Sequence, residues 1–125
     1  MEKEQIENVM EKYKKAWETQ SLELIAECFS EQGEYQESPL SKPFVGHDQI
    51  KEFWKETVCN NQSHISFSIK NCWVSADNQT GFCEWECTLA ENGVCERMVG
   101  IMILKMEGDK ITHLNEYWNT QKIQK

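Results

Sequence analysis

Apolar residues in the first part of the chain recur with the period of an α-helix. From Ile6 to Trp17 they fall three or four residues apart with Glu and Lys between them, which predicts an amphipathic helix. Ser21, a good N-cap residue, begins a second, shorter helix that extends to Phe29 and is broken by Gly33, and a third begins near His47. The apolar positions of the three helices are Ile6, Val9, Met10, Tyr13, Ala16 and Trp17; Leu22, Ile25, Ala26 and Phe29; and Ile50, Phe53, Trp54 and Val58.

The pattern changes to alternation from His64 onward. Ile65, Phe67 and Ile69 alternate with polar residues, as in a half-buried strand. Further strands are predicted over 82–89, 94–106 and 111–119, with a short one over 34–37 and a proline-containing loop over 38–46. Helices followed by a meander of long antiparallel strands predict an α+β fold, with helices packed on one face of a curved sheet.

A two-residue turn at Asn92-Gly93 sets the register of one hairpin. It places Trp85 opposite Gly100, and the missing side chain leaves room for the indole ring. One face of the hairpin then carries Cys83, Trp85, Cys87, Met98, Gly100 and Met102. The other carries Phe82, Glu84, Glu86, Arg97, Val99, Ile101 and Ile103.

Neither face of this hairpin has the composition of a plain solvent face. Helices can cover only one of them, so a second copy of the chain is expected to cover the other. We therefore predict a homodimer through the convex face, with Val99, Ile101 and Ile103 at the interface.

Composition narrows the classes of function. The 125 residues suit one domain, 1–125, and carry a net charge of −8, which argues against nucleic acid or an anionic membrane as a partner. The charged start of the chain resembles no secretory signal, so we expect a cytoplasmic protein. The six cysteines are interpreted as mostly buried free thiols.

No metal and no cofactor is expected. Cys83, Cys87 and Cys95 lack a C-x-x-C knuckle, and a strand would hold Cys83 and Cys87 too far apart for one tetrahedral zinc site. The chain also contains no nucleotide-binding fingerprint, no glycine-rich phosphate loop and no nucleophile–base pair.

The stretch from Trp17 to Trp54 resembles the SnoaL-like pattern of the NTF2-like superfamily, which includes polyketide cyclases, ketosteroid isomerases and limonene-epoxide hydrolases. The matching residues are Tyr35, Glu37, Pro39, Pro43, Gly46, Ile50 and Trp54. Glu84-Trp85 and Glu116-Tyr117-Trp118 also fit, so the resemblance covers essentially the whole chain. It implies a cone-shaped, cystatin-like α+β fold with a central pocket.

The resemblance also implies roles for individual residues. Tyr13 falls at the oxyanion-hole tyrosine of ketosteroid isomerases and Glu37 at their catalytic base, whereas the second acid of that site would lie near Met102, which cannot donate a proton. The Asp-Arg-Asp trio of limonene-epoxide hydrolases is not matched, because Arg97 lies on the outward face. The pocket lining is expected to be Trp17, Tyr35, Phe53, Trp54, Trp85, Met102, Leu114, Glu116 and Trp118.

The facing of the last strand stays open. A two-residue loop at Gly108-Asp109 would aim Leu114, Glu116 and Trp118 outward, a three-residue loop would aim them inward, and the resemblance favours inward.

We interpret the chain as binding a small apolar or aromatic molecule in a pocket that either only binds this ligand or also carries out cofactor-independent acid–base chemistry on it. Glu37 is the candidate base, and Tyr13 or Tyr35 is the candidate hydrogen-bond donor. A carboxylate in an apolar pocket gains basicity from desolvation. The alternatives are a Glu37 that only pairs with Lys42 or caps an amide, and a non-catalytic dimeric interaction domain with a closed pocket. Trp73 is interpreted as core filling.

Overall fold

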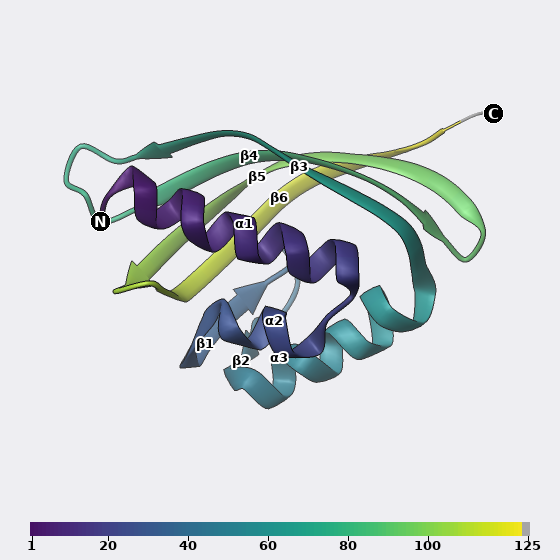
Figure 1. Ribbon diagram of the computed structural model, residues 1–125, viewed down its shortest axis with the longest axis horizontal. Coiled ribbons are helices and arrows are strands. Elements are labelled where there is room, and N and C mark those ends of the chain that lie inside the picture. Colours follow the sequence, from purple (N-terminus) through teal and green to yellow (C-terminus); the bar gives the residue numbers. More distant parts are fainter. Residues whose placement is uncertain (124–125) are drawn as a thin grey trace.

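Three helices pack against one face of a six-stranded sheet in the computed structural model, which describes residues 1–123 (Figure 1). The helices are α1 (Lys3–Thr19), α2 (Leu22–Glu27) and α3 (Gly46–Trp54), the last followed by a π-helical turn, η1 (Lys55–Cys59). The strands are β1 (Phe29–Gln36), β2 (Phe44–Val45), β3 (Gln62–Val74), β4 (Gly81–Glu91), β5 (Val94–Glu107) and β6 (Lys110–Lys122). This confirms the α+β fold predicted from the pattern, with helices packed on one face of a curved sheet.

The sheet order is β2-β1-β6-β5-β4-β3, antiparallel except where β1 runs parallel to β6. The sheet arches over the helices, so its concave face holds the core and no helix covers its convex face (Figure 1). The apolar stripe of α1, from Ile6 to Trp17, is fully on the buried side. None of the helices over residues 1–123 is both long and apolar enough to cross a membrane.

The second helix is shorter than its apolar pattern predicts. It begins as expected, with Ser21 accepting a hydrogen bond from the Leu24 amide at 3.1 Å, but it ends at Glu27. Phe29 instead begins β1 and stacks on Tyr35 with ring centroids 5.5 Å apart. Gly33 lies inside β1, where a Cβ would come within 2.9 Å of the Ile111 carbonyl oxygen. This glycine therefore permits a close strand approach and does not stop a helix.

The register of the β4–β5 hairpin is as predicted. Glu91 pairs with Val94, Cys83 with Met102, and Trp85 with Gly100. A side chain at Gly100 would collide with the carbonyl oxygen of Tyr117 on β6, and its Cβ would also lie 2.8 Å from the Cβ of Trp118.

A β-bulge decides the facing of β6. The turn at Gly108-Asp109 is a two-residue loop, with Glu107 paired to Lys110, which by itself would aim the strand outward. The register then shifts: Met106 pairs with Ile111 and Lys105 with His113, so Thr112 is the extra residue. A bulge of one residue exchanges the two faces of a strand. Leu114, Glu116 and Trp118 consequently face the concave side.

Trp73 does not fill the core, contrary to its interpretation from the sequence. It lies on β3 and is 43% exposed. The register of β3 against β4 shifts between Ile69 and Asn71, and this bulge exchanges the faces of the residues beyond it. Trp73 is thereby placed on the convex face.

Candidate functional site

A cavity of about 300 Å³ lies between α1, α3, η1 and the concave face of the sheet. Its lining comes from every one of these elements and from the loop after β1. The residues are Trp17, Tyr35, Glu37, Phe53, Thr57, Val58, Gln62, Trp85, Glu91, Glu96, Met98, Glu116, Trp118 and Thr120.

Tyr13, Tyr35 and Glu116 form a buried hydrogen-bonded cluster at the cavity wall. The Tyr13 hydroxyl lies 2.6 Å from the Tyr35 hydroxyl and 2.8 Å from Oε2 of Glu116. The Tyr35 hydroxyl lies 3.3 Å from Oε1 of the same carboxyl group. Tyr35 and Glu116 line the cavity, and Tyr13 lies behind them on α1.

Burial is the main reason why the pKa of Glu116 is raised. The residue is only 4% exposed, and its pKa rises to about 8 because the carboxylate loses its hydration. Hydrogen bonds from the two tyrosines lower that pKa in part, and the charge of Glu37 raises it. The same burial, with the nearby Glu116, raises the pKa of Tyr13 and Tyr35. Burial therefore shifts all three groups of the cluster toward their protonated forms.

A protonated Glu116 can orient the cluster toward the cavity. When Glu116 is ionised, both tyrosine hydroxyls donate to it. When Glu116 is protonated, its proton could instead be donated to Tyr13 and the Tyr13 hydroxyl could donate to Tyr35, which would leave the Tyr35 proton for a ligand atom. Such a chain of hydrogen bonds places its free donor on the cavity wall, where an oxygen atom of a bound molecule could accept it.

Glu37 lies on the same cavity wall, just after β1. Its carbonyl oxygen accepts a 2.6 Å hydrogen bond from Nε1 of Trp118. The adjacent Gln36 donates to the Ser41 carbonyl oxygen at 2.8 Å and accepts from Asn115 at 2.6 Å. The hydrogen bonds to Trp118 and Asn115 hold the end of β1 against β6. The backbone that carries the Glu37 side chain is therefore fixed in place.

The structure brings most of the predicted pocket residues together. Trp17, Tyr35, Phe53, Trp85, Glu116 and Trp118 line the cavity, together with Glu37. Trp54, Met102 and Leu114 are instead buried in the surrounding core and do not line it. Met102 is the Cα partner of Glu116, so an acid is present one strand away from the position that the ketosteroid isomerase resemblance implied.

Sequence reasoning missed the far end of the cavity. Gln62, Glu91, Glu96, Met98 and Thr120 line it where β3 to β6 reach the Asn92-Gly93 turn. Met98 was already placed on the same hairpin face as Trp85, without being assigned to the pocket, and continuing that alternation by one step along β5 would have added Glu96. Thr57 and Val58 reach the cavity from the π-helical turn, which no pattern in the sequence indicates.

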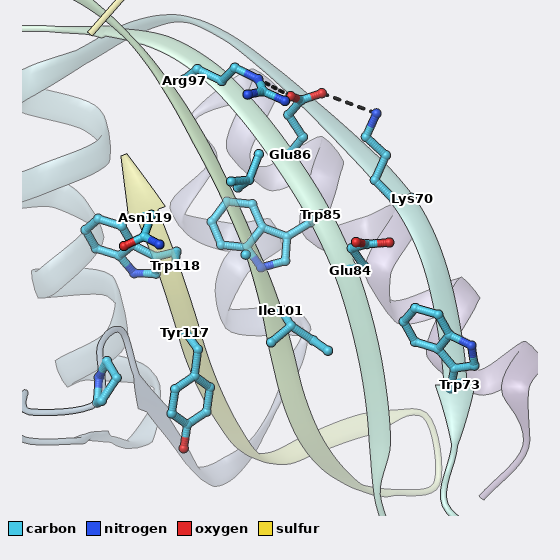
Figure 2. Close-up of a pocket in the computed structure, with 13 residues that line it drawn as sticks. Lys70, Trp73, Glu84, Trp85, Glu86, Arg97, Ile101, Tyr117, Trp118 and Asn119 are labelled. Atoms are coloured by element: carbon cyan, nitrogen blue, oxygen red, sulfur yellow. Dashed lines mark hydrogen bonds and ion pairs between the residues drawn. The ribbon is translucent and has the colours of Figure 1, made fainter. Parts of the chain in front are cut away.

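A second hollow, of about 690 Å³, lies on the convex face of the sheet. Figure 2 shows its polar rim, where Glu86 pairs with both Arg97 and Lys70. Ile101, Tyr117 and Trp73 lie along the same face, and Trp85 and Trp118 are seen between the strands (Figure 2).

No metal-binding cluster of His, Cys, Asp or Glu occurs among residues 1–123. All six cysteines are free. Cys72 and Cys83 face each other across β3 and β4 with their sulfur atoms 3.6 Å apart.

Comparison with known proteins gives a family match and several similar folds. A family model described as a SnoaL-like domain matches residues 10–114. The structure of RV0760c from Mycobacterium tuberculosis is similar, with 9% identity, 98% of this chain and 99% of that one covered, and a TM-score of 0.83. A candidate isomerase from Bacillus subtilis is 21% identical over 95% of this chain and 90% of that one, with a TM-score of 0.83.

The epoxide hydrolase/cyclase-like enzyme SalBIII, which acts in pyran ring formation, is 10% identical. That match covers 94% of this chain and 95% of SalBIII, with a TM-score of 0.80. At these identities the likeness shows a shared fold. No curated protein matches the chain by sequence.

Proposed function

This chain belongs to the SnoaL-like domain family, and from that premise we propose that its cavity binds a small molecule and carries out a cofactor-independent acid–base reaction on it. The reaction would be of the isomerase, cyclase or hydrolase type. The observation that supports this most is the pairing of a buried, proton-retaining Tyr13–Tyr35–Glu116 cluster with a separate carboxylate, Glu37, on one cavity wall. Two acid groups in different environments can take opposite roles in proton transfer.

Glu37 is proposed as the base and Tyr35 as the donor that contacts the ligand. Tyr13 acts one step behind, as the group that links Tyr35 to the Glu116 proton. A substrate with a carbonyl or similar oxygen would accept the Tyr35 hydrogen bond while Glu37 removes a proton from the neighbouring carbon. Placing a donor where negative charge develops stabilises the transition state, and the proton returns to carbon from Glu37 or from water.

The test is proton exchange on 2-tetralone, a flat aromatic ketone with acidic protons beside its carbonyl group. In D₂O, the protein should accelerate deuterium incorporation measured by NMR. Glu37→Gln and Tyr35→Phe should each lower the protein-dependent rate by about 100-fold or more. Glu34→Gln, also on β1 but paired with His113 at the surface, should leave the rate unchanged.

Exchange that continues at the wild-type rate in Glu37→Gln would remove Glu37 as the base. Absence of acceleration by the wild-type protein would contradict the enzymatic proposal. It would favour a pocket that only binds its ligand or the alternative, a non-catalytic dimeric interaction domain.

A homodimer through the convex face is proposed as well. That face has no helix over it (Figure 1) and exposes Trp73, Val99 and Tyr117 by 38–43% each, next to the predicted Ile101 and Ile103. Such a patch is typical of a protein–protein interface.

A further inference from the structure

The charge of the cavity wall is one-sided. Four carboxyl groups line it, those of Glu37, Glu91, Glu96 and Glu116. No Lys, Arg or His is among the described residues that line it. Glu37, Glu91 and Glu96 form no ion pair with any residue in 1–123. The cavity therefore holds negative charge that nothing on its own wall neutralises.

The rest of the wall is mostly aromatic. Trp17, Trp85 and Trp118 line the cavity along with Tyr35 and Phe53. The faces of aromatic rings attract a cation, most strongly when it is a weakly hydrated ammonium group. A cavity lined by aromatic rings and carboxylates can therefore attract positive charge in two ways, through the ring faces and through the carboxylate charge.

Polar atoms without partners also occur in this wall. Oε1 of Gln62 is buried and has no donor within the described residues. Nε1 of Trp17 and Nε1 of Trp85 have no acceptor there, and as donors they could serve an acceptor atom of the ligand but not its positive charge. Gln62 is the Cα partner of Glu91, and Glu96 lies on the next strand. A free acceptor is thus adjacent to the two carboxylates at the far end of the cavity.

We propose that the ligand of this cavity carries a positively charged nitrogen, as a protonated or quaternary amine with an apolar body. Glu91 and Glu96 would hold the nitrogen at the far end of the cavity, and the apolar body would extend along the aromatic wall toward Tyr35 and Glu116. The inference rests on the proposed function in taking the same cavity as the ligand site, and it narrows the substrate class from apolar molecules to cationic ones.

The alternatives are disfavoured by the same charges. An anion would approach at least three carboxylates in a chain of net charge −8. A neutral ligand would bury the carboxylates of Glu91 and Glu96 without giving them a partner, and this costs free energy.

The experiment compares choline with 3,3-dimethylbutan-1-ol, its neutral analogue with carbon in place of the charged nitrogen. Calorimetric titration at constant ionic strength should show choline binding at least about tenfold more tightly than the alcohol. The double variant Glu91→Gln/Glu96→Gln should lose at least about tenfold in choline affinity. The control Glu107→Gln/Asp109→Asn, which removes the same charge from the exposed β5–β6 turn, should bind choline as the wild type does.

Equal or tighter binding of the alcohol would overturn the inference and leave the cavity as a binding site. Choline affinity unchanged in the Glu91/Glu96 variant, or binding of neither probe, would also overturn it. The 2-tetralone assay contains no cationic ligand, so it tests only the proposed reaction. If that reaction fails while the cationic ligand is correct, choline will bind but no exchange will be observed.

Discussion

Glu116 shows how far one residue can depart from its ordinary chemistry. A buried carboxylate is costly unless it is neutralised or well hydrogen-bonded, and here it has both Tyr13 and Tyr35 as partners. The titratable groups that face it are those two tyrosines, Glu37 and the Cys87 thiol. Burial, together with the nearby Glu116, raises the pKa of the Cys87 thiol to about 12. None of these is a cation that could hold the ionised form.

The pKa of Glu116 makes stability depend on pH. Between the ordinary pKa of 4.5 and the raised value of about 8, the unfolded chain releases a proton that the folded chain retains. The free energy of unfolding should therefore fall as pH rises through this window, by about 1.4 kcal/mol for each pKa unit, and level off above it. Urea unfolding of wild type and Glu116→Gln, in reducing buffer from pH 5 to pH 9, measures the difference.

We expect Glu116→Gln to gain stability relative to the wild type as pH rises. Glu84→Gln, which removes one charge from an exposed position on β4, should give a curve parallel to that of the wild type. Parallel curves for Glu116→Gln as well would mean that the buried carboxyl group ionises freely in the folded state.

Among the elements, β6 depends most on a detail of backbone geometry. Its cavity-facing residues reach the concave side only because Thr112 is an extra residue opposite Lys105 and Met106. The Thr112 hydroxyl also donates to the Lys105 carbonyl oxygen at 3.2 Å. The number of residues and the hydroxyl group can be separated experimentally.

Deleting Thr112 should abolish native packing, because Leu114, Glu116 and Trp118 would be turned to the convex face. Thr112→Ala keeps the residue count and should lose only about 1 kcal/mol for the hydrogen bond. Near-UV circular dichroism and urea unfolding distinguish the two variants. A deletion variant as stable as Thr112→Ala would show that the bulge does not determine the facing.

The helices and strands differ in how well their ends could be predicted. The Asn92-Gly93 turn fixed an entire hairpin register, since a tight turn leaves one pairing. Phe29 was misplaced because the apolar positions of a short helix and of the strand after it are compatible with one continuous pattern. Strand β2 has only two residues, which is too few for an alternating pattern. The π-helical turn contacts Gln20, a residue distant in the sequence, so local patterns give no sign of it.

For the whole molecule, the uncovered convex face leads to a prediction about assembly. Ile101→Glu would place a charge in the middle of the proposed interface, where it would be desolvated without a partner. We expect this variant to elute as a monomer in size-exclusion chromatography while the wild type elutes as a dimer. Val94→Glu, at an exposed position next to the β4–β5 turn, should elute with the wild type.

An elution volume unchanged by Ile101→Glu would contradict the convex-face interface. A cytoplasmic location stays a prediction from the sequence.

The sequence by itself determined the order of the main helices and long strands, the amphipathic face of α1 and the β4–β5 register, because all of these follow from local periodicity and turn chemistry. Tertiary structure decided which residues meet. Only the folded chain brings Tyr13, Tyr35 and Glu116 into one hydrogen-bonded cluster and gathers four carboxyl groups around one cavity. The physical reason is that burial and charge proximity are set by packing between distant segments. A single bulge reverses the face of β6, and its one trace in the sequence is the three-residue spacing of the buried Ile111 and Leu114.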